Sequence, residues 1–185
     1  PAVMSLRVTP DELEIIADRP DPLPAPWIEG DGPHRWRLPL PSLLDPAAAG
    51  ARRSVLVPLG QDRDGGVILV NLAAAGLLGI DGPAERSAHI IRAAALTLAT
   101  APWTDVDVVV IDAGTTPTSL GRAQFAPDLH AALALAQPRR TLVVAALAPL
   151  RDEDRRQLHR TTDDGDVLAL IPGRGLDPLR SWIID

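Results

Sequence analysis

The chain has few side chains that could do chemistry. It contains no cysteine, and all 18 residues counted as Lys+Arg are arginine. These absences exclude a cysteine nucleophile, a thiolate metal site, a disulfide and a Schiff-base lysine. The histidines (His34, His89, His130 and His159) share no metal-ligand spacing. No G-x-S-x-G nucleophile elbow occurs either. We therefore expect neither a catalytic residue nor a resident metal.

The segment from Gly79 to Ser87, GIDGPAERS, is the best candidate for a ligand-binding loop. An apolar strand precedes it and an apolar helix follows it. A phosphate loop needs glycines so that backbone N–H groups can converge, a lysine for the phosphates, and a Ser or Thr hydroxyl for magnesium. Gly79 and Gly82 supply glycines, and Arg86 followed by Ser87 supplies a cation and a hydroxyl.

Other residues of the same segment favour a capped helix start without a nucleotide. Pro83 has no N–H, and Asp81 and Glu85 bring two carboxylates to the positive end of the helix dipole. We expect Gly82 to be the helix cap and Pro83 the first helical residue. Glu85, three residues after Gly82, could then reach back to an N–H at the cap. A weak nucleotide site is the alternative.

Asp112 is a second polar candidate, at the end of a predicted buried strand. It opens the sequence Asp112-Ala113-Gly114-Thr115-Thr116, which is similar to the DxGTT turn that binds γ-phosphate in sugar kinases of the actin-like superfamily. In those kinases the turn joins two antiparallel strands near the start of the chain, whereas here it ends a strand in mid-chain. We therefore favour a turn capped by the side chain of Asp112.

Strands alternate with helices from residue 76 onward, which predicts a parallel sheet with helices on both faces. The segments Asp107–Asp112, Thr141–Ala146 and Asp166–Ile171 are apolar on both faces, as in buried parallel strands. GLLGIDG and PLRSWIID are predicted as further strands. The predicted helices are PAERSAHIIRAAALTLATA, PDLHAALALAQ and RDEDRRQLHR. The expected fold class is α/β, a three-layer sandwich.

Residues 1–52 have a different composition, which predicts a Pro-rich arm packed on a body formed by residues 53–185. SLRV reads as a short strand, TPDELEII as a helical turn capped by Thr9, and HRWRL as an edge strand. Trp27 and Trp36 are expected to anchor the arm. After the arm, SVLVPLG and VILVNL flank QDRDGG, which has the Asp and Gly chemistry of a β-hairpin loop.

Composition and charge restrict the partners. The chain is 46% hydrophobic with a formal net charge of −6. This charge argues against non-specific binding to nucleic acid or to an anionic membrane. No apolar run reaches the roughly 18 residues that a membrane span needs, so we expect no direct membrane insertion of this segment.

The order of these elements resembles the FtsK/SpoIIIE-type ATPase domain, especially as it occurs in the EccC proteins of type VII secretion. The similarity lies in LPLPSLLDP, VLVPLGQDRDGGVILVNL and GLLGIDGPAERSAHIIRAAALTLA. The string VPLG…NLAAAGLLGIDG…IIRAAALTLATAPW is also similar to a domain of large actinobacterial membrane proteins that carry LysM modules and a bacterial transcriptional activator domain. The resemblance covers roughly residues 34–175 and implies a P-loop NTPase-like fold within a longer protein.

Departures from the family pattern imply a degenerate domain that does not hydrolyse ATP. In the active family, the strand matching TLVVAALAPL ends in an Asp-Glu pair, which falls here at Ala145 and Ala146. The family's loop lysine falls at Arg86, whose planar fork does not replace a point charge. The resemblance therefore implies a cytoplasmic, non-catalytic interaction or regulatory module without a cofactor, whose partners are proteins or other domains of its own chain. The alternative is a nucleotide-binding switch or weak ATPase that binds ATP through Gly79–Ser87.

Overall fold

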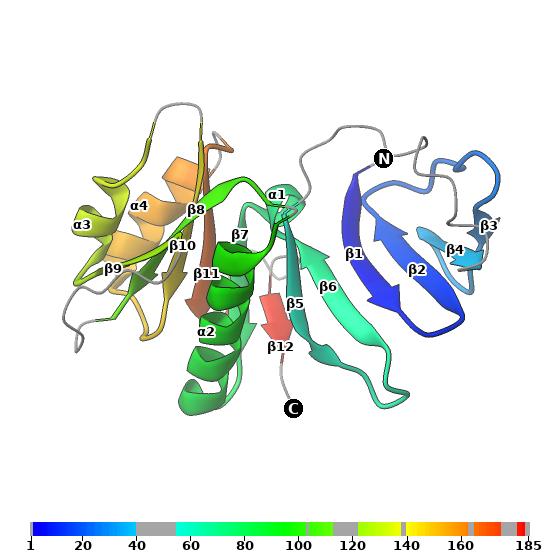
Figure 1. Cartoon of the computed structure of the whole chain (residues 1–185), viewed down its shortest axis with the longest axis horizontal. Helices are drawn as coiled ribbons and strands as arrows, with labels where there is room; N and C mark the ends of the chain where they lie inside the picture. Colours follow the sequence, from blue (N-terminus) through cyan, green and yellow to red (C-terminus); the bar gives the residue numbers. More distant parts are fainter. Residues whose placement is uncertain are drawn as a thin grey trace. The chain divides into compact units, whose positions relative to one another are not determined.

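The computed structural model describes residues 2–39, 55–102, 104–112, 122–137, 140–162, 165–174 and 181–183. The chain forms two compact units, Pro1–Ala74 and Ala75–Asp185. Figure 1 shows the strands of the first unit and the helices and strands of the second. Together they make an α/β protein with one antiparallel and one parallel sheet.

The first unit is an antiparallel sheet in the order β3-β4-β2-β1-β6-β5. Its strands are β1 (Val3–Val8), β2 (Glu12–Ala17), β3 (Ile28–Glu29), β4 (Arg35–Pro39), β5 (Leu56–Gln61) and β6 (Val67–Asn71). The predicted strand SLRV lies in β1, and the predicted hairpin is confirmed as β5 and β6. β4 covers the predicted HRWRL strand except for His34, but it lies between β2 and β3, so the prediction of an edge strand was wrong.

The prediction of a helical turn in TPDELEII was also wrong, because Glu12–Ala17 is strand β2. The Thr9 hydroxyl does accept hydrogen bonds from the N–H groups of Asp11 and Glu12, at 3.4 and 3.1 Å. These bonds belong to the tight turn between β1 and β2, in which the N–H of Thr9 donates to the carbonyl of Glu12 at 3.0 Å. The expected cap therefore serves a β-turn instead of a helix.

The first unit has its own small core, formed by Ile15, Ala17 and Trp36. Leu23 and Trp27, from the Pro-rich stretch between β2 and β3, pack against it. The two tryptophans therefore join this stretch to its own sheet. The hairpin of β5 and β6 extends the same sheet, because β6 pairs with β1. The sequence had grouped this hairpin with the C-terminal body.

The second unit is a parallel sheet in the order β12-β7-β11-β10-β8-β9. Its strands are β7 (Leu77–Asp81), β8 (Val106–Ile111), β9 (Ala123–Ala126), β10 (Thr141–Ala146), β11 (Val167–Pro172) and β12 (Ser181–Ile183). The helices are α1 (Leu72–Ala75), which lies across the boundary between the units, α2 (Ala84–Thr100), α3 (Leu129–Leu133) and α4 (Asp152–Thr162).

The doubly apolar pattern is confirmed for the three central strands. β10 pairs in parallel with both β8 and β11. Nearly every residue of the three strands is buried. Helices α2, α3 and α4 are also confirmed, as is the final strand β12. β9 was missed, because Ala123–Ala126 is a four-residue segment with no period of its own.

Helices pack on this sheet through apolar stripes. α2 buries Ile91, Ala94, Ala95 and Leu98 among others. Leu129 of α3 and Leu158 of α4 belong to the apolar cluster that includes Val144 of β10. In the part of the chain that the structure describes, no helix is long and apolar enough to cross a membrane.

Candidate functional site

The turn between β7 and α2 is much shorter than a phosphate loop. β7 runs to Asp81 and α2 begins at Ala84, so only Gly82 and Pro83 connect them. Gly79 is not part of the turn: it is buried within β7, paired with Ile171 on one side. Because it lies within the strand, its backbone is paired with the neighbouring strands of the sheet. Few N–H groups are therefore left to converge on an anion.

The helix cap lies one residue later than the sequence predicted. Pro83 is the N-cap residue, with φ −55° and ψ 130°, and its side chain makes no capping hydrogen bond. The expectations that Gly82 caps the helix and that Glu85 reaches back to a cap N–H were therefore wrong, because a proline cap has no N–H. Glu85 still lies in the first turn of α2, where its charge favours the helix dipole.

An ion pair occupies the carboxyl end of β7 beside this turn. The Nε of Arg174 donates to Oδ2 of Asp81 at 2.8 Å. The preceding N–H, that of Gly173, donates to the carbonyl of Ile80 at 2.7 Å. Arg155 of α4 donates to the carbonyl of Arg174. The carboxylate next to the candidate loop is thus held by an arginine of the chain itself.

Arg86 and Ser87 lie in the first turns of α2 but face different surroundings. Arg86 is exposed, whereas Ser87 is only 1% exposed and belongs to the buried face of the helix. Within the described residues, the Ser87 hydroxyl has no hydrogen-bond partner. In this conformation the hydroxyl is shut away from solvent, so a metal–nucleotide complex cannot reach it without movement of the helix.

Asp112 lies at the same edge of the sheet but far from the β7–α2 turn. It follows β8, and β11 and β10 stand between β8 and β7. Three strand spacings put it at about 14 Å from β7. Its N–H donates to the carbonyl of Ala126 at 3.1 Å. The remainder of the DAGTT sequence, residues 113–116, lies outside the described residues.

The carboxyl end of the central strand has no acidic group. β10 ends at Ala145 and Ala146, both 0% exposed. The next N–H, that of Leu147, donates to the carbonyl of Ile111 at 3.1 Å. The positions that the resemblance assigns to an Asp-Glu pair are therefore apolar and buried, and they provide no oxygen ligand for magnesium.

Carboxylates of the chain also lie at the start of α3 and α4. Asp128 caps α3, accepting the N–H of Ala131 at 2.8 Å. α4 has Asp152, Glu153 and Asp154 in its first turn. There Asp154 pairs with Arg151 at 3.0 Å, and this contact raises the pKa of Arg151. The helix dipoles are thus complemented from within the chain.

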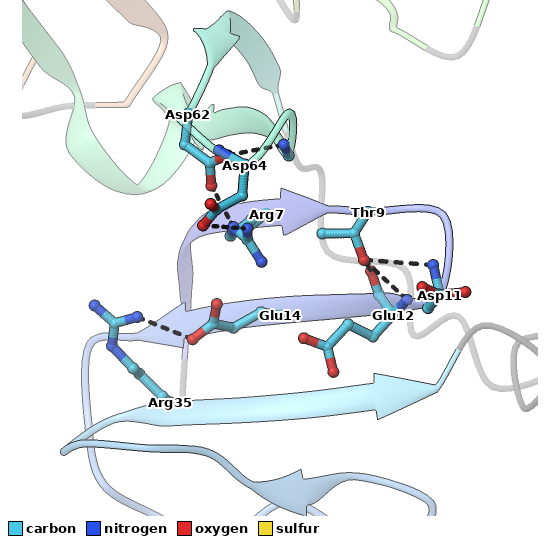
Figure 2. Close-up of polar contacts among 9 residues, drawn as sticks. Arg7, Thr9, Asp11, Glu12, Glu14, Arg35, Asp62 and Asp64 are labelled. Carbon is cyan, nitrogen blue, oxygen red and sulfur yellow. Dashed lines mark hydrogen bonds and ion pairs between the residues drawn. The ribbon is translucent and has the colours of Figure 1, made fainter.

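A group of ion pairs on the N-terminal sheet was not expected from the sequence. Arg7 of β1 binds Asp62 at the start of the β5–β6 turn, and Asp64 of that turn lies 3.7 Å from the same guanidinium (Figure 2). Oδ1 of Asp62 also accepts the N–H groups of Asp64 and Gly66, at 3.0 and 2.8 Å. The hydrogen bond from Arg7, with the backbone donors, holds the pKa of Asp62 below its ordinary value.

The same sheet contains a second ion pair, between Glu14 of β2 and Arg35 of β4, at 2.9 Å (Figure 2). The register also places Glu14 between Arg7 on β1 and Arg37 on β4. This alternation of charge across three strands stabilises their pairing. It could have been found from the sequence only if Glu12–Ala17 had been recognised as a strand.

Among the described residues, no group of three or more His, Cys, Asp or Glu side chains is placed to hold a metal ion. Comparisons with protein families, with curated proteins and with solved structures returned no match to this chain.

Proposed function

We propose that the second unit is a degenerate P-loop-like module, a three-layer α/β sandwich that does not hydrolyse ATP and serves interaction or regulation within a longer protein. The observation that carries this proposal is the occupied edge of the sheet beside α2. Asp81 is bound by Arg174, and the two-residue turn of Gly82 and Pro83 leaves no room for a nest of N–H groups.

The chemistry of phosphoryl transfer supports the same proposal. Catalysis of this reaction depends on positioning and on neutralising charge by lysine and magnesium. The chain has no lysine at all. Ala145 and Ala146 stand where the resemblance would put metal-binding carboxylates, and Glu85 and Asp81 would repel a triphosphate. The proposed partners are proteins or other domains of the parent chain. They would bind the surface of the module, and this binding requires no catalysis.

Phosphate release from ATP with magnesium tests the proposal. We expect no turnover above background in the full chain, in Arg86→Ala, or in Arg92→Ala. The last variant is a matched control, because it removes the same charge from an exposed position on the same helix. Magnesium-dependent turnover that is lost in Arg86→Ala and kept in Arg92→Ala would overturn the proposal and establish an ATPase.

A nucleotide-binding switch is the second candidate, and the buried Ser87 hydroxyl favours it. Buried polar groups are nearly always hydrogen-bonded, and within the described chain this hydroxyl has no hydrogen-bond partner. A shift of α2 on binding ATP and magnesium would give it one. Calorimetric titration with ATP, with and without magnesium, separates the two candidates. Micromolar, magnesium-dependent binding that is weakened in Ser87→Ala would replace the non-catalytic module with the switch.

A further inference from the structure

The C-terminal strand β12 is a short edge strand that depends on a single neighbour. Among the described residues it pairs with β7 alone, in parallel, with Ser181 opposite Gly79 and Ile183 opposite Asp81. Its three residues are fewer than most strands have. β11 pairs with the other side of β7, with Ile171 also opposite Gly79. The chain therefore holds β7 between two strands that follow each other in sequence.

A chain of three contacts fixes the backbone where it leaves β11 on its way to β12. The N–H of Gly173 bonds to Ile80, the guanidinium of Arg174 binds Asp81, and Arg155 binds the carbonyl of Arg174. We call the Arg174–Asp81 pair, with Arg155, the clasp. The clasp therefore connects α4, the segment after β11 and the end of β7, where Asp81 is also the backbone partner of Ile183 in β12.

The clasp is placed so that it can open. The side chain of Arg174 is 78% exposed and that of Asp81 is 29% exposed. An ion pair with this exposure is weak and is screened by salt. Asp81 also directly precedes Gly82 of the β7–α2 turn. One carboxylate therefore takes part in both the docking of the C-terminal strand and the surroundings of the start of α2.

We propose that the clasp is a reversible device that controls the docking of β12 on β7 and couples this strand to the β7–α2 turn. When the clasp is closed, β12 completes the edge of the sheet. When it opens, β12 detaches more often and the carboxylate of Asp81 is released beside the turn. Coupling of this kind is reciprocal, so an event at the turn changes strand docking by the same factor. The device does not depend on the proposed function, because the docking of β12 on β7 requires neither a partner nor the absence of ATP hydrolysis.

Amide hydrogen exchange on the full chain, without nucleotide, tests the proposal. In Arg174→Ala we expect the amides of residues 181–183 to exchange about 1.5- to 5-fold faster, the range for an exposed ion pair. Asp81→Asn should give the same result. Amides of β10 should keep their rates, because the clasp does not contact that strand. Arg160→Ala is the matched control, since this exposed arginine of α4 donates to the carbonyl of Arg156 in its own helix.

Salt provides a second measurement. Salt at 1 M should bring the exchange of residues 181–183 in the unmodified chain to the rate of Arg174→Ala and leave that variant almost unchanged. Unchanged exchange in both clasp variants would overturn the proposal. Equal acceleration in β10, or in Arg160→Ala, would also overturn it, because either shows general destabilisation. These outcomes are independent of ATP turnover, so the proposed function and the clasp can fail separately.

Discussion

At the scale of single residues, the clearest electrostatic contact is that between Arg7 and Asp62. The pKa of Asp62 is lowered in the folded protein, chiefly by the hydrogen bond from Arg7. A group of this kind stabilises the fold at pH values above its unfolded pKa of about 4. That stability is lost as the pH falls through the lower, folded pKa. We therefore expect Asp62→Asn to be less stable than the unmodified chain at pH 7, by a gap that closes as the pH falls below about 4.

Urea unfolding of both proteins between pH 3 and pH 7 measures this gap. Asp64→Asn is the matched control, because it removes the same charge from a side chain that is 85% exposed and 3.7 Å from Arg7. At pH 7 it should cost less than Asp62→Asn. A gap for Asp62→Asn that is the same at pH 3 and pH 7 would contradict the assignment of this contact.

Arg122 is a structural arginine that the sequence did not single out. Its guanidinium donates to the carbonyls of Ala99, Ala101 and Thr104, at 3.2, 2.6 and 2.6 Å. These carbonyls lie at and just after the C-terminal end of α2, where helices have unsatisfied acceptors. The planar guanidinium spreads its N–H donors in a fixed geometry toward three separated acceptors, whereas the three donors of a lysine ammonium all lie on one nitrogen.

Removing this fork should destabilise the chain. We expect Arg122→Ala to lower the free energy of unfolding by about 2 kcal/mol and Arg122→Lys by about half of that. Urea unfolding measures both. Arg92→Ala, an exposed site on the same helix, should stay within about 0.5 kcal/mol of the unmodified chain. Equal stability of Arg122→Ala and Arg92→Ala would show that water replaces the guanidinium without cost.

At the scale of elements, the predictions were correct where a hydrophobic pattern was compatible with only one secondary structure. β8, β10 and β11 are apolar on both faces, and only a buried parallel strand fits that pattern in an alternating chain. β2 failed because Thr9, Asp11 and Glu12 read equally well as a helix start and as a β-turn. Pairing with β1 across the turn at Thr9, and with β4 about 20 residues later, makes this segment a strand. The ion pairs of the N-terminal sheet depend on the register of that strand, so they could not be predicted from the sequence either.

The start of α2 offers a test of the corrected cap. Pro83 is the N-cap and makes no side-chain hydrogen bond to the first turn. The hydroxyl of a serine at this position can accept a hydrogen bond from a backbone N–H of that turn, and an alanine side chain cannot. We expect Pro83→Ser to be more stable than Pro83→Ala by about 1 kcal/mol in thermal or urea unfolding. If instead Gly82 were the cap, the two variants would have equal stability, and this result would restore the cap predicted from the sequence.

At the scale of the whole molecule, two units of different construction share one short chain. The first is an antiparallel sheet with a small core around Ile15 and Trp36. The second is a parallel sheet whose core includes Leu142 and Val144 of the central strand. The sequence separated a Pro-rich arm from an α/β body, because prolines and periodic apolar segments are local signals. It grouped the β5–β6 hairpin with the body, because the pairing of β6 with β1, about 60 residues earlier, is not a local signal.

Separate cores predict that the two units lose stability separately. Ile15 is 3% exposed in the first core, and Leu142 is 1% exposed in the second. Truncation of either side chain to alanine should cost about 2–5 kcal/mol, through lost burial and the cavity left behind. Because locally cooperative parts of a protein open with their own free energies, we expect Ile15→Ala to speed amide exchange in β2 and β4 but not in β10 and β11. Leu142→Ala should do the reverse. The two variants, followed side by side by hydrogen exchange in the full chain, measure this directly. Faster amide exchange in both sheets in either variant would show that the two units unfold cooperatively as one. The boundary between Ala74 and Ala75 would then separate two groups of contacts but not two cooperative units.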